Sequence, residues 1–153
     1  KWAKGLSLPK GHIPATHYWL VDGNEYIGEV SIRHRLTKKL KELGGHIGYG
    51  IRPSKRRKGY GTRLLALALK KARLLGIERI LITCDEDNIG SRKIIEANGG
   101  VLKDVIHTKL NPGKRTMRFW ISINYVPRER LERSRPKARA PKARVYTNFT
   151  TAA

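Results

Sequence analysis

A glycine-containing loop joins a short apolar segment to the longest helical pattern of the chain, and this junction most constrains the fold. Residues 52–76 read RPSKRRKGYGTRLLALALKKARLLG, with Gly59 and Gly61 just before apolar residues at helical spacing. Glycine lets a backbone turn sharply and approach a ligand closely. The first N–H groups of a helix lack intrahelical partners and favour an anion. The junction therefore predicts either a tight strand-to-helix turn with solvated charges or an anion-binding loop.

Segments with strand-like and helix-like patterns alternate along the chain. The expected strands are residues 16–21, 25–36, 46–51, 79–84, 101–107 and 117–125, and the expected helices are residues 62–76 and a short one after Asn88. Residues 37–45 form a polar connector with one helical turn at most. This order predicts a mixed α/β domain over residues 1–126.

The chain is strongly basic, and the basic residues continue into a tail of low apolar content. The 153 residues carry a net charge of +21, and residues 127–144 contain eight Lys or Arg against two Glu. Such an excess attracts polyanions, which include nucleic acid, CoA and ATP. We therefore expect residues 127–153 to be a Pro/Arg-rich tail that is disordered when free. Its functional interpretation is a nucleic-acid-binding arm, and the alternative is a solvated extension.

The composition argues against membrane, disulfide and metal-binding classes. The longest unbroken apolar run is residues 64–69, far below the roughly 20 residues that span a bilayer, and the first residues lack the apolar core of a signal peptide. The single cysteine, Cys84, excludes an internal disulfide framework and fits a reducing interior such as the cytoplasm. Asp85, Glu86 and Asp87 are consecutive, so they point in different directions and favour loop charge over a metal site.

Two motifs resemble those of the GNAT superfamily of N-acetyltransferases. RRKGYG is similar to the [Q/R]-x-x-G-x-[G/A] loop of that family, with Arg56, Gly59 and Gly61 at the defining positions. Downstream, DNIGSRKIIEANGG is similar to its N-x-x-[AS]…G-[FG] segment, with Asn88 and Ser91 matching. The whole pattern resembles most closely the predicted bacterial acetyltransferases of this superfamily. Two motifs in this order favour the anion-binding interpretation of the glycine loop.

The resemblance implies a GNAT-like central mixed sheet with flanking helices, acetyl-CoA as donor and a primary amine as acceptor. The pyrophosphate would lie on the backbone amides of residues 57–62, and the pantetheine arm between strands 46–51 and 79–84. We expect a monomer or homodimer, with no metal and no membrane partner. The implied cofactor-binding residues are Ile51, Arg56, Arg57, Lys58, Gly59, Tyr60, Gly61, Thr62, Asn88 and Ser91.

Two departures from the family pattern concern catalysis. Only about 15 residues precede the first expected strand, so the N-terminal strand and helices that help to form the acceptor site are expected to be shortened or missing. The position at which many members carry an acidic Tyr holds Ile95. The alternative to an enzyme is therefore a catalytically weak or inactive module that binds CoA or nucleic acid.

His46, Glu29 and Tyr49 are the candidate catalytic residues. An unperturbed imidazole has a pKa near 6.5, so His46 is a candidate base, the alternative being a structural histidine. Glu29 and His34, on the preceding expected strand, are weaker candidates, and Glu29 equally fits the solvated face of a hairpin. The conceivable substitutes for the missing acid are Tyr49, Tyr60 and Cys84.

Overall fold

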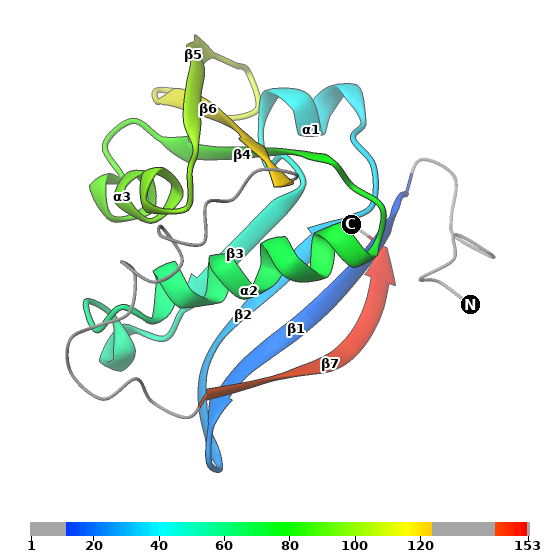
Figure 1. Cartoon of the computed structure of the whole chain (residues 1–153). Helices are drawn as coiled ribbons and strands as arrows, with labels where there is room; N and C mark the ends of the chain where they lie inside the picture. Colours follow the sequence, from blue (N-terminus) through cyan, green and yellow to red (C-terminus); the bar gives the residue numbers. More distant parts are fainter. Residues whose placement is uncertain (1–11, 124–142, 153) are drawn as a thin grey trace.

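Two antiparallel β-sheets and the helices packed against them make up the fold (Figure 1). The computed structural model describes residues 12–123 and the strand at residues 143–152. In chain order the elements are β1 (Pro14–Asp22), β2 (Glu25–Arg33), α1 (Lys38–Glu42), β3 (Ile47–Ile51), the 3₁₀ turn η2 (Pro53–Lys55), α2 (Tyr60–Leu74), β4 (Arg79–Asp85), α3 (Ile89–Ala97), β5 (Val101–His107), β6 (Arg115–Ser122) and β7 (Ala143–Ala152). The strand orders are β3-β2-β1-β7 and β4-β6-β5. The expected α/β class is confirmed.

The β1–β2 hairpin forms the middle of the first sheet. Its strands pair antiparallel and are joined by a two-residue turn in which Gly23 adopts a φ of +60°. Tyr18, Leu20, Val30 and Ile32 are buried on the side of the core. The alternation seen in the sequence therefore reflects a sheet with one buried face.

Helix α2 covers one face of the first sheet (Figure 1). The buried residues at helical spacing are Leu64, Leu65, Ala68, Leu69 and Ala72. The helix begins at Tyr60, two residues earlier than the sequence pattern predicts, because Gly59 takes a left-handed φ of +82° as the N-cap. Among the described residues, no helix is long and apolar enough to cross a membrane.

The second sheet and α2 hold α3 between them. Asn88 caps the start of α3, where its Oδ1 accepts the N–H of Ser91 at 3.1 Å. At the other end the buried Asn98 donates from Nδ2 to the carbonyl oxygens of Thr62 and Ile94, at 3.2 and 2.9 Å. The Asn98 amide thus ties the C-terminal end of α3 to the first turn of α2.

The two sheets are joined where β3 begins. The N–H of His46 donates to the carbonyl of Leu81 at 2.7 Å, and the N–H of Leu81 donates to His46 Nδ1 at 2.9 Å. Close by, the N–H of Gly44 donates to Thr83 Oγ1 at 2.9 Å. We call these three hydrogen bonds the β3–β4 joint. From the joint the two strands diverge toward α3 (Figure 1), so the expected single mixed sheet is divided into two antiparallel sheets here.

Strand β7 corrects the expectation of a disordered tail for residues 143–152. These residues pair antiparallel with β1 and extend the first sheet. The sequence VYTNFTT, at 145–151, is rich in β-forming residues that the basic residues before it obscured. Residues 1–11 and 124–142 lie outside the described residues. The expectation of a shortened N-terminal part, the expected domain boundary and most of the expected nucleic-acid-binding arm fall there.

We expect Gly45→Ala to destabilise the protein far more than Gly23→Ala. The two glycines have nearly the same φ, +61° and +60°, so the left-handed backbone costs both variants about 1–2 kcal/mol. At Gly45 the added Cβ would also collide with the backbone carbonyl of Leu81 in the joint, whereas nothing lies within 4 Å of a Cβ at Gly23. Urea unfolding should show a loss above about 3 kcal/mol for Gly45→Ala. Equal losses in the two variants would contradict this account of the joint.

Candidate active site

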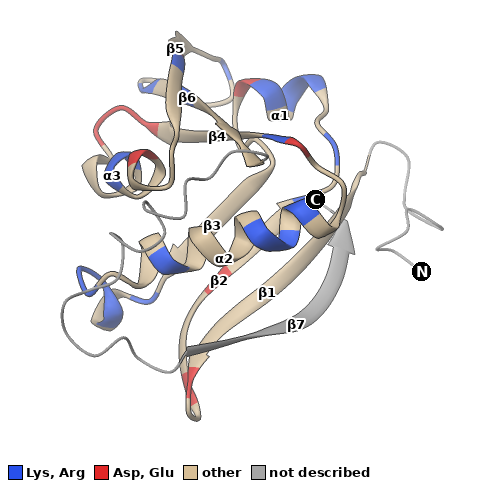
Figure 2. Ribbon diagram, in the orientation of Figure 1, with Lys and Arg blue, Asp and Glu red and all other residues tan. Residues whose placement is uncertain are grey.

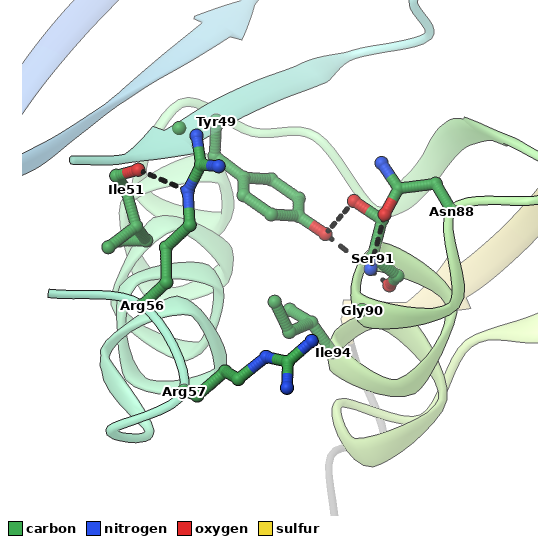
Figure 3. Close-up of a pocket in the computed structure, with 9 residues that line it drawn as sticks. Tyr49, Ile51, Arg56, Arg57, Asn88, Gly90, Ser91 and Ile94 are labelled. Carbon is green, nitrogen blue, oxygen red and sulfur yellow. Dashed lines mark hydrogen bonds between the residues drawn. The ribbon is translucent and has the colours of Figure 1, made fainter. Parts of the chain in front are cut away.

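A cavity of about 350 Å³ opens between the C-terminal end of β3, the loop before α2 and the start of α3 (Figure 3). Its lining residues come from the C-terminal end of β3, from the loop before α2 and from the segment that follows β4. Its lining combines two guanidinium groups, three polar side chains and an apolar wall. The lining residues are Tyr49, Gly50, Ile51, Arg56, Arg57, Asn88, Gly90, Ser91 and Ile94.

The loop before α2 brings positive charge and free backbone donors to the mouth of the cavity. No side chain caps the first turn of α2, so its N–H groups have the unpaired character that favours an anion. Arg56 donates from Nε to the carbonyl of Ile51 at 3.0 Å, which leaves the end of the guanidinium to the cavity side (Figure 3). Arg57 holds a φ of +57°, a costly conformation for a residue other than glycine.

The charged residues of this loop and of α2 are all positive. Residues 52–73 contain nine Lys or Arg and no Asp or Glu, and Figure 2 shows their side of the fold as blue on the loop and on α2. Glu25 pairs with Arg52 and Lys55 at 3.7 and 2.9 Å. No ion pair among the described residues involves Arg56 or Arg57, the two cations that line the cavity, so their charge is available to a bound anion.

Across the cavity, β3 and α3 meet through two hydroxyl groups. Tyr49 Oη lies 3.1 Å from Ser91 Oγ and 3.4 Å from the carbonyl oxygen of Ser91 (Figure 3). Burial raises the pKa of Tyr49 to about 12, so the phenol keeps its proton at neutral pH. The carboxamide oxygen of Asn88 is used by the helix cap, and its nitrogen faces outward from that bond (Figure 3).

Five of the ten predicted cofactor-binding residues line the cavity, namely Ile51, Arg56, Arg57, Asn88 and Ser91. The other five lie beside it, in the loop and the first turn of α2. Lys58 is exposed, Gly59 is the N-cap, Tyr60 is buried in the core, and Thr62 is half-buried with its carbonyl bound by Asn98. Gly59 and Gly61 have no side chain and that of Tyr60 is buried, so these residues offer backbone groups, whereas the exposed Lys58 adds a cation beside the cavity.

Gly61 is required for a different reason than the sequence suggested. It lies within α2 and does not have a positive φ, unlike Gly59. A Cβ at Gly61 would lie 2.6 Å from Cδ1 of Ile94, so the glycine allows α2 and α3 to pack closely. Ile94 itself lines the cavity, as do Gly50 and Gly90, and sequence reasoning missed all three. Ile94 follows Ser91 by three residues on a helix, and that spacing was the available signal.

The structure argues against His46 as the catalytic base. Its Nδ1 accepts the N–H of Leu81, so the lone pair that would take a proton is already occupied. Burial, and then the charge of Arg33, lower the pKa of His46 to about 4, which leaves it a poor proton acceptor at neutral pH. Arg33 donates from Nη1 to the carbonyls of Gly44 and Gly45 at 3.2 and 3.1 Å. The histidine belongs to the β3–β4 joint.

The three catalytic candidates are not brought together. Glu29 is exposed on β2 and pairs in register with Gly50 of β3. Because side chains alternate along a strand, Glu29 lies on the face of the sheet opposite to Tyr49. His34 contacts Thr16 Oγ1 through Nε2 at 2.7 Å, away from the cavity lining.

The candidates for the missing acid differ in how deeply they are buried and in whether they line the cavity. Ile95 is fully buried, and its carbonyl oxygen accepts the N–H of Gly100 at 2.9 Å, so its position offers no proton donor to the cavity. Cys84 is also buried, and burial raises its pKa to about 11. Tyr60 is buried at the start of α2. Of these three possible substitutes, all within the described residues, only Tyr49 lines the cavity.

The acidic run at the end of β4 is paired with basic residues of the β5–β6 hairpin. Asp85 contacts Lys114 at 3.1 Å and Glu86 contacts Arg115 at 3.1 Å, while Asp87 lies 3.9 Å from Lys114. Within the described residues, no group of three or more His, Cys, Asp or Glu side chains is arranged to hold a metal ion. These carboxylates therefore anchor the hairpin to the β4–α3 loop.

Comparison with known families identifies the fold. The family model of the acetyltransferase (GNAT) domain matches residues 3–101, which is more than half of the chain. The chain therefore belongs to the GNAT acetyltransferase family, and the resemblance carried by the two motifs is confirmed. A search of curated protein sequences finds no significant match.

Solved structures of acetyltransferases share this fold. The protein yncA of Salmonella typhimurium, described as an acetyltransferase and solved with its cofactor acetyl-CoA, matches at a TM-score of 0.55 and 14% identity, over 82% of this chain and 69% of that one. Mutant forms of the spermidine/spermine N-acetyltransferase SpeG of Vibrio cholerae match at 0.59 and 18%, over 78% and 71%. The ribosomal L7/L12 alpha-N-protein acetyltransferase RimL, in complex with CoA, matches at 0.59 and 24%, over 72% and 63%. At these levels of sequence identity, the similarity to the solved structures shows a shared fold and no more.

We expect the stability difference between the wild type and His46→Asn to shrink in acid. The asparagine Oδ1 can still accept the N–H of Leu81, but it does not titrate. In the wild type the folded-state pKa of His46 is about 4, below the unfolded value of 6.5. The unfolded state therefore binds more protons between these values, and stability falls by about 3 kcal/mol as the pH drops from 6.5 to 4.

Urea unfolding at several pH values measures this difference. The advantage of the wild type at pH 7 should diminish steadily between pH 6.5 and 4, and other titrating groups cancel because both proteins contain them. A difference that stays constant over this range would show that His46 is not held neutral in the folded protein.

Proposed function

We propose that the protein is an acetyl-CoA-dependent N-acetyltransferase that transfers an acetyl group to a primary amine. The single observation that carries this proposal is the cavity at the diverging ends of β3 and β4, where a basic loop and the starts of two helices converge. Membership of the GNAT family supports acetyl-CoA as the donor. When bound, that donor supplies an activated acetyl thioester.

The residues at the cavity suit the parts of CoA. Arg56, Arg57 and the N–H groups of the first turn of α2 provide the positive surroundings that a pyrophosphate requires. β3 is the edge of its sheet on the side of β4, so residues 49–51 have backbone groups without a sheet partner in the described part of the chain. Such groups can bind the amides of a pantetheine arm. Ile51 and Ile94 add an apolar wall.

An amine must lose a proton to be acetylated, and Glu29 is the remaining candidate to accept it. His46 is committed to the joint, whereas the Glu29 carboxylate is exposed. It lies beside Gly50, a position where a Cβ would have nothing within 4 Å, so the sheet face there is open to an acceptor. An acceptor on the face opposite to α2 fits this exposure, with Glu29 acting directly or through a water molecule.

The class of acceptor follows from the chemistry of similar folds. Spermidine and spermine are the acceptors named for one structural neighbour, and the amino terminus of a ribosomal protein for another. Both offer a primary amine. We assign the same functional group to the acceptor of this protein.

One observation favours a second function, a CoA-binding module without catalysis. The position that usually supplies an acid holds Ile95, which is fully buried. A fold that binds CoA but lacks a means of stabilising the leaving sulfur would bind the donor and not turn it over.

Calorimetry with acetyl-CoA, followed by a thiol-release assay on a panel of amines, separates the two functions. We expect acetyl-CoA to bind the full chain and free thiol to appear only when an amine acceptor is present. Polyamines and short peptides with free amino termini should be included in the panel. Binding without thiol release on any amine would support the module, and absence of binding would rule out both functions.

We expect Gly61→Ala to weaken acetyl-CoA binding about tenfold by moving Ile94 into the cavity. The new Cβ would lie 2.6 Å from Cδ1 of Ile94, the mobile end of a side chain that lines the site. Ile94→Val lacks that carbon and costs only about 1 kcal/mol of stability. The double variant Gly61→Ala, Ile94→Val should therefore recover most of the affinity in calorimetry. If the double variant binds no better than Gly61→Ala, the glycine acts on the loop and not through Ile94.

A further inference from the structure

A second cavity, of about 580 Å³, lies between α1 and the hairpin formed by β5 and β6. It shares no lining residue with the candidate active site, and α1 lies beside this hairpin, away from the loop before α2 (Figure 1). The proposed function makes no use of this cavity. Its lining residues are Lys38, Lys39, Glu42, Ile106, His107, Thr108, Lys109, Leu110 and Arg118.

Hydrogen bonds from the hairpin to α1 hold the two walls of this cavity together. Thr108 Oγ1 donates to Glu42 Oε2 at 2.8 Å, and Arg118 Nη1 donates to the carbonyl oxygen of Lys41 at 3.0 Å. Arg118 also donates from Nε and Nη2 to the two carboxylate oxygens of Asp104, at 2.6 and 2.5 Å. The walls are therefore fixed in place, and a carboxylate already neutralises the charge of Arg118.

The other cations of the lining are three lysines without an acidic partner. Lys38, Lys39 and Lys109 are exposed, and no ion pair among the described residues involves them. Residues 35–41 contain four Lys or Arg and no Asp or Glu, and Figure 2 shows blue on α1. Glu42 is the one acid in the lining, and the Thr108 hydroxyl binds one of its oxygens. The cavity therefore attracts an anion.

The kind of cation distinguishes a phosphate ligand from a carboxylate ligand. Arginine recognises a carboxylate through a planar fork of two parallel hydrogen bonds, and the one arginine of the lining already binds Asp104 in this way. A lysine ammonium is a point charge that can approach a phosphate from any direction. Lys38 and Lys39 lie on α1 and Lys109 follows β5, so cations on both walls fit a ligand with several phosphates.

Two further lining residues offer a surface to a base. His107 is exposed at the end of β5, and Leu110 is 42% exposed in the turn that follows. Histidine rings are among the groups on which unpaired bases stack. A duplex presents its phosphates to a protein but keeps the faces of its bases stacked inside. The lining therefore suits a single strand better than a duplex.

We propose that this cavity binds single-stranded nucleic acid, with Lys38, Lys39 and Lys109 contacting phosphates and His107 stacking on a base. The site lies on the folded domain, whereas the sequence alone pointed to the tail as the nucleic-acid-binding arm. The inference goes beyond the proposed function and does not depend on it. Because the two cavities share no residue, the strand and acetyl-CoA bind at the same time.

Fluorescence anisotropy of a labelled oligouridine, titrated with the full chain at several salt concentrations, measures this binding. Each phosphate contact on a single strand contributes about −0.7 to the slope of log affinity against log salt concentration. The triple variant Lys38→Gln, Lys39→Gln, Lys109→Gln should therefore reduce the steepness of the slope by about 2. At about 50 mM salt the same variant should bind at least about tenfold more weakly than the wild type.

A second triple variant, Lys70→Gln, Arg73→Gln, Lys93→Gln, is the matched control. It removes the same charge from exposed positions that line neither cavity. Its slope should stay within about 0.5 of the wild-type value, because none of its three cations contacts the strand. Calorimetry should show that both triple variants bind acetyl-CoA within about threefold of the wild type, which also establishes that they fold.

Two variants of His107 test the contact with a base. His107→Ala removes the ring and should weaken oligouridine binding about fivefold or more, whereas His107→Phe keeps a ring and should bind like the wild type. Full affinity in His107→Ala would overturn the assignment of a single strand. Tighter binding of a duplex RNA of the same length would overturn it as well.

The remaining outcomes decide where the strand binds and which polyanion the site prefers. Equal losses in the two triple variants would show a response to overall charge alone, and displacement by acetyl-CoA would place the strand in the other cavity. Either result overturns the inference. So does a polyglutamate peptide that binds as tightly as oligouridine and loses as much in the first triple variant. If the wild type binds no oligouridine, the inference falls, but binding of acetyl-CoA, and with it the proposed function, is unaffected.

Discussion

The exchange of two hydrogen bonds between His46 and Leu81 is the contact on which the rest of the structure depends. It joins the two sheets at one end only, and it requires Gly45 because a side chain there would meet the β4 backbone. Beyond this point β3 and β4 have no ladder between them, so they part and leave a space that α3 and the basic loop enclose. A continuous ladder would have satisfied more backbone groups and closed the site. The cavity therefore exists because pairing stops after one position.

Charged and neutral polar groups occupy different parts of the cavity. Guanidinium groups and helix-start amides lie at the loop, where an anionic group can remain near solvent. The hydroxyls of Tyr49 and Ser91 lie between β3 and α3, where partial burial raises the pKa of the phenol. Neutral donors are suited to such a place because a buried, unpaired charge would be far more costly there. The arrangement thus separates the charged donors of the cavity from its neutral ones.

Short-range sequence patterns predicted most of the fold and, apart from Gly50, Gly90 and Ile94, the residues that line the cavity. The glycine loop, the start of α2 and the cap at Asn88 are local features, because their causes lie within a few residues in the sequence. His46 is the opposite case. The sequence shows only that the side chain of His46 is ionisable. The N–H that binds its Nδ1 belongs to Leu81, 35 residues later in the chain. Likewise, the contact that explains Gly61 is made by Ile94 on another helix. Strand β7 was missed because a basic segment precedes it and its partner, β1, lies at the other end of the chain.

The position of the β3–β4 joint has a mechanical consequence. β3 is paired along its whole length with β2, so it moves with the first sheet when that sheet rotates about the joint. It extends five residues beyond His46 to Ile51, a length of about 16 Å at the usual rise of a strand. A rotation of about 5° at the joint would move the far end of β3 by roughly 1.4 Å over that length. Displacements near Gly45 and His46, too small to alter the hydrogen bonds there, are thus magnified at the cavity. The width of the opening is set where the strands meet, at the end of β3 farthest from Ile51 and the loop.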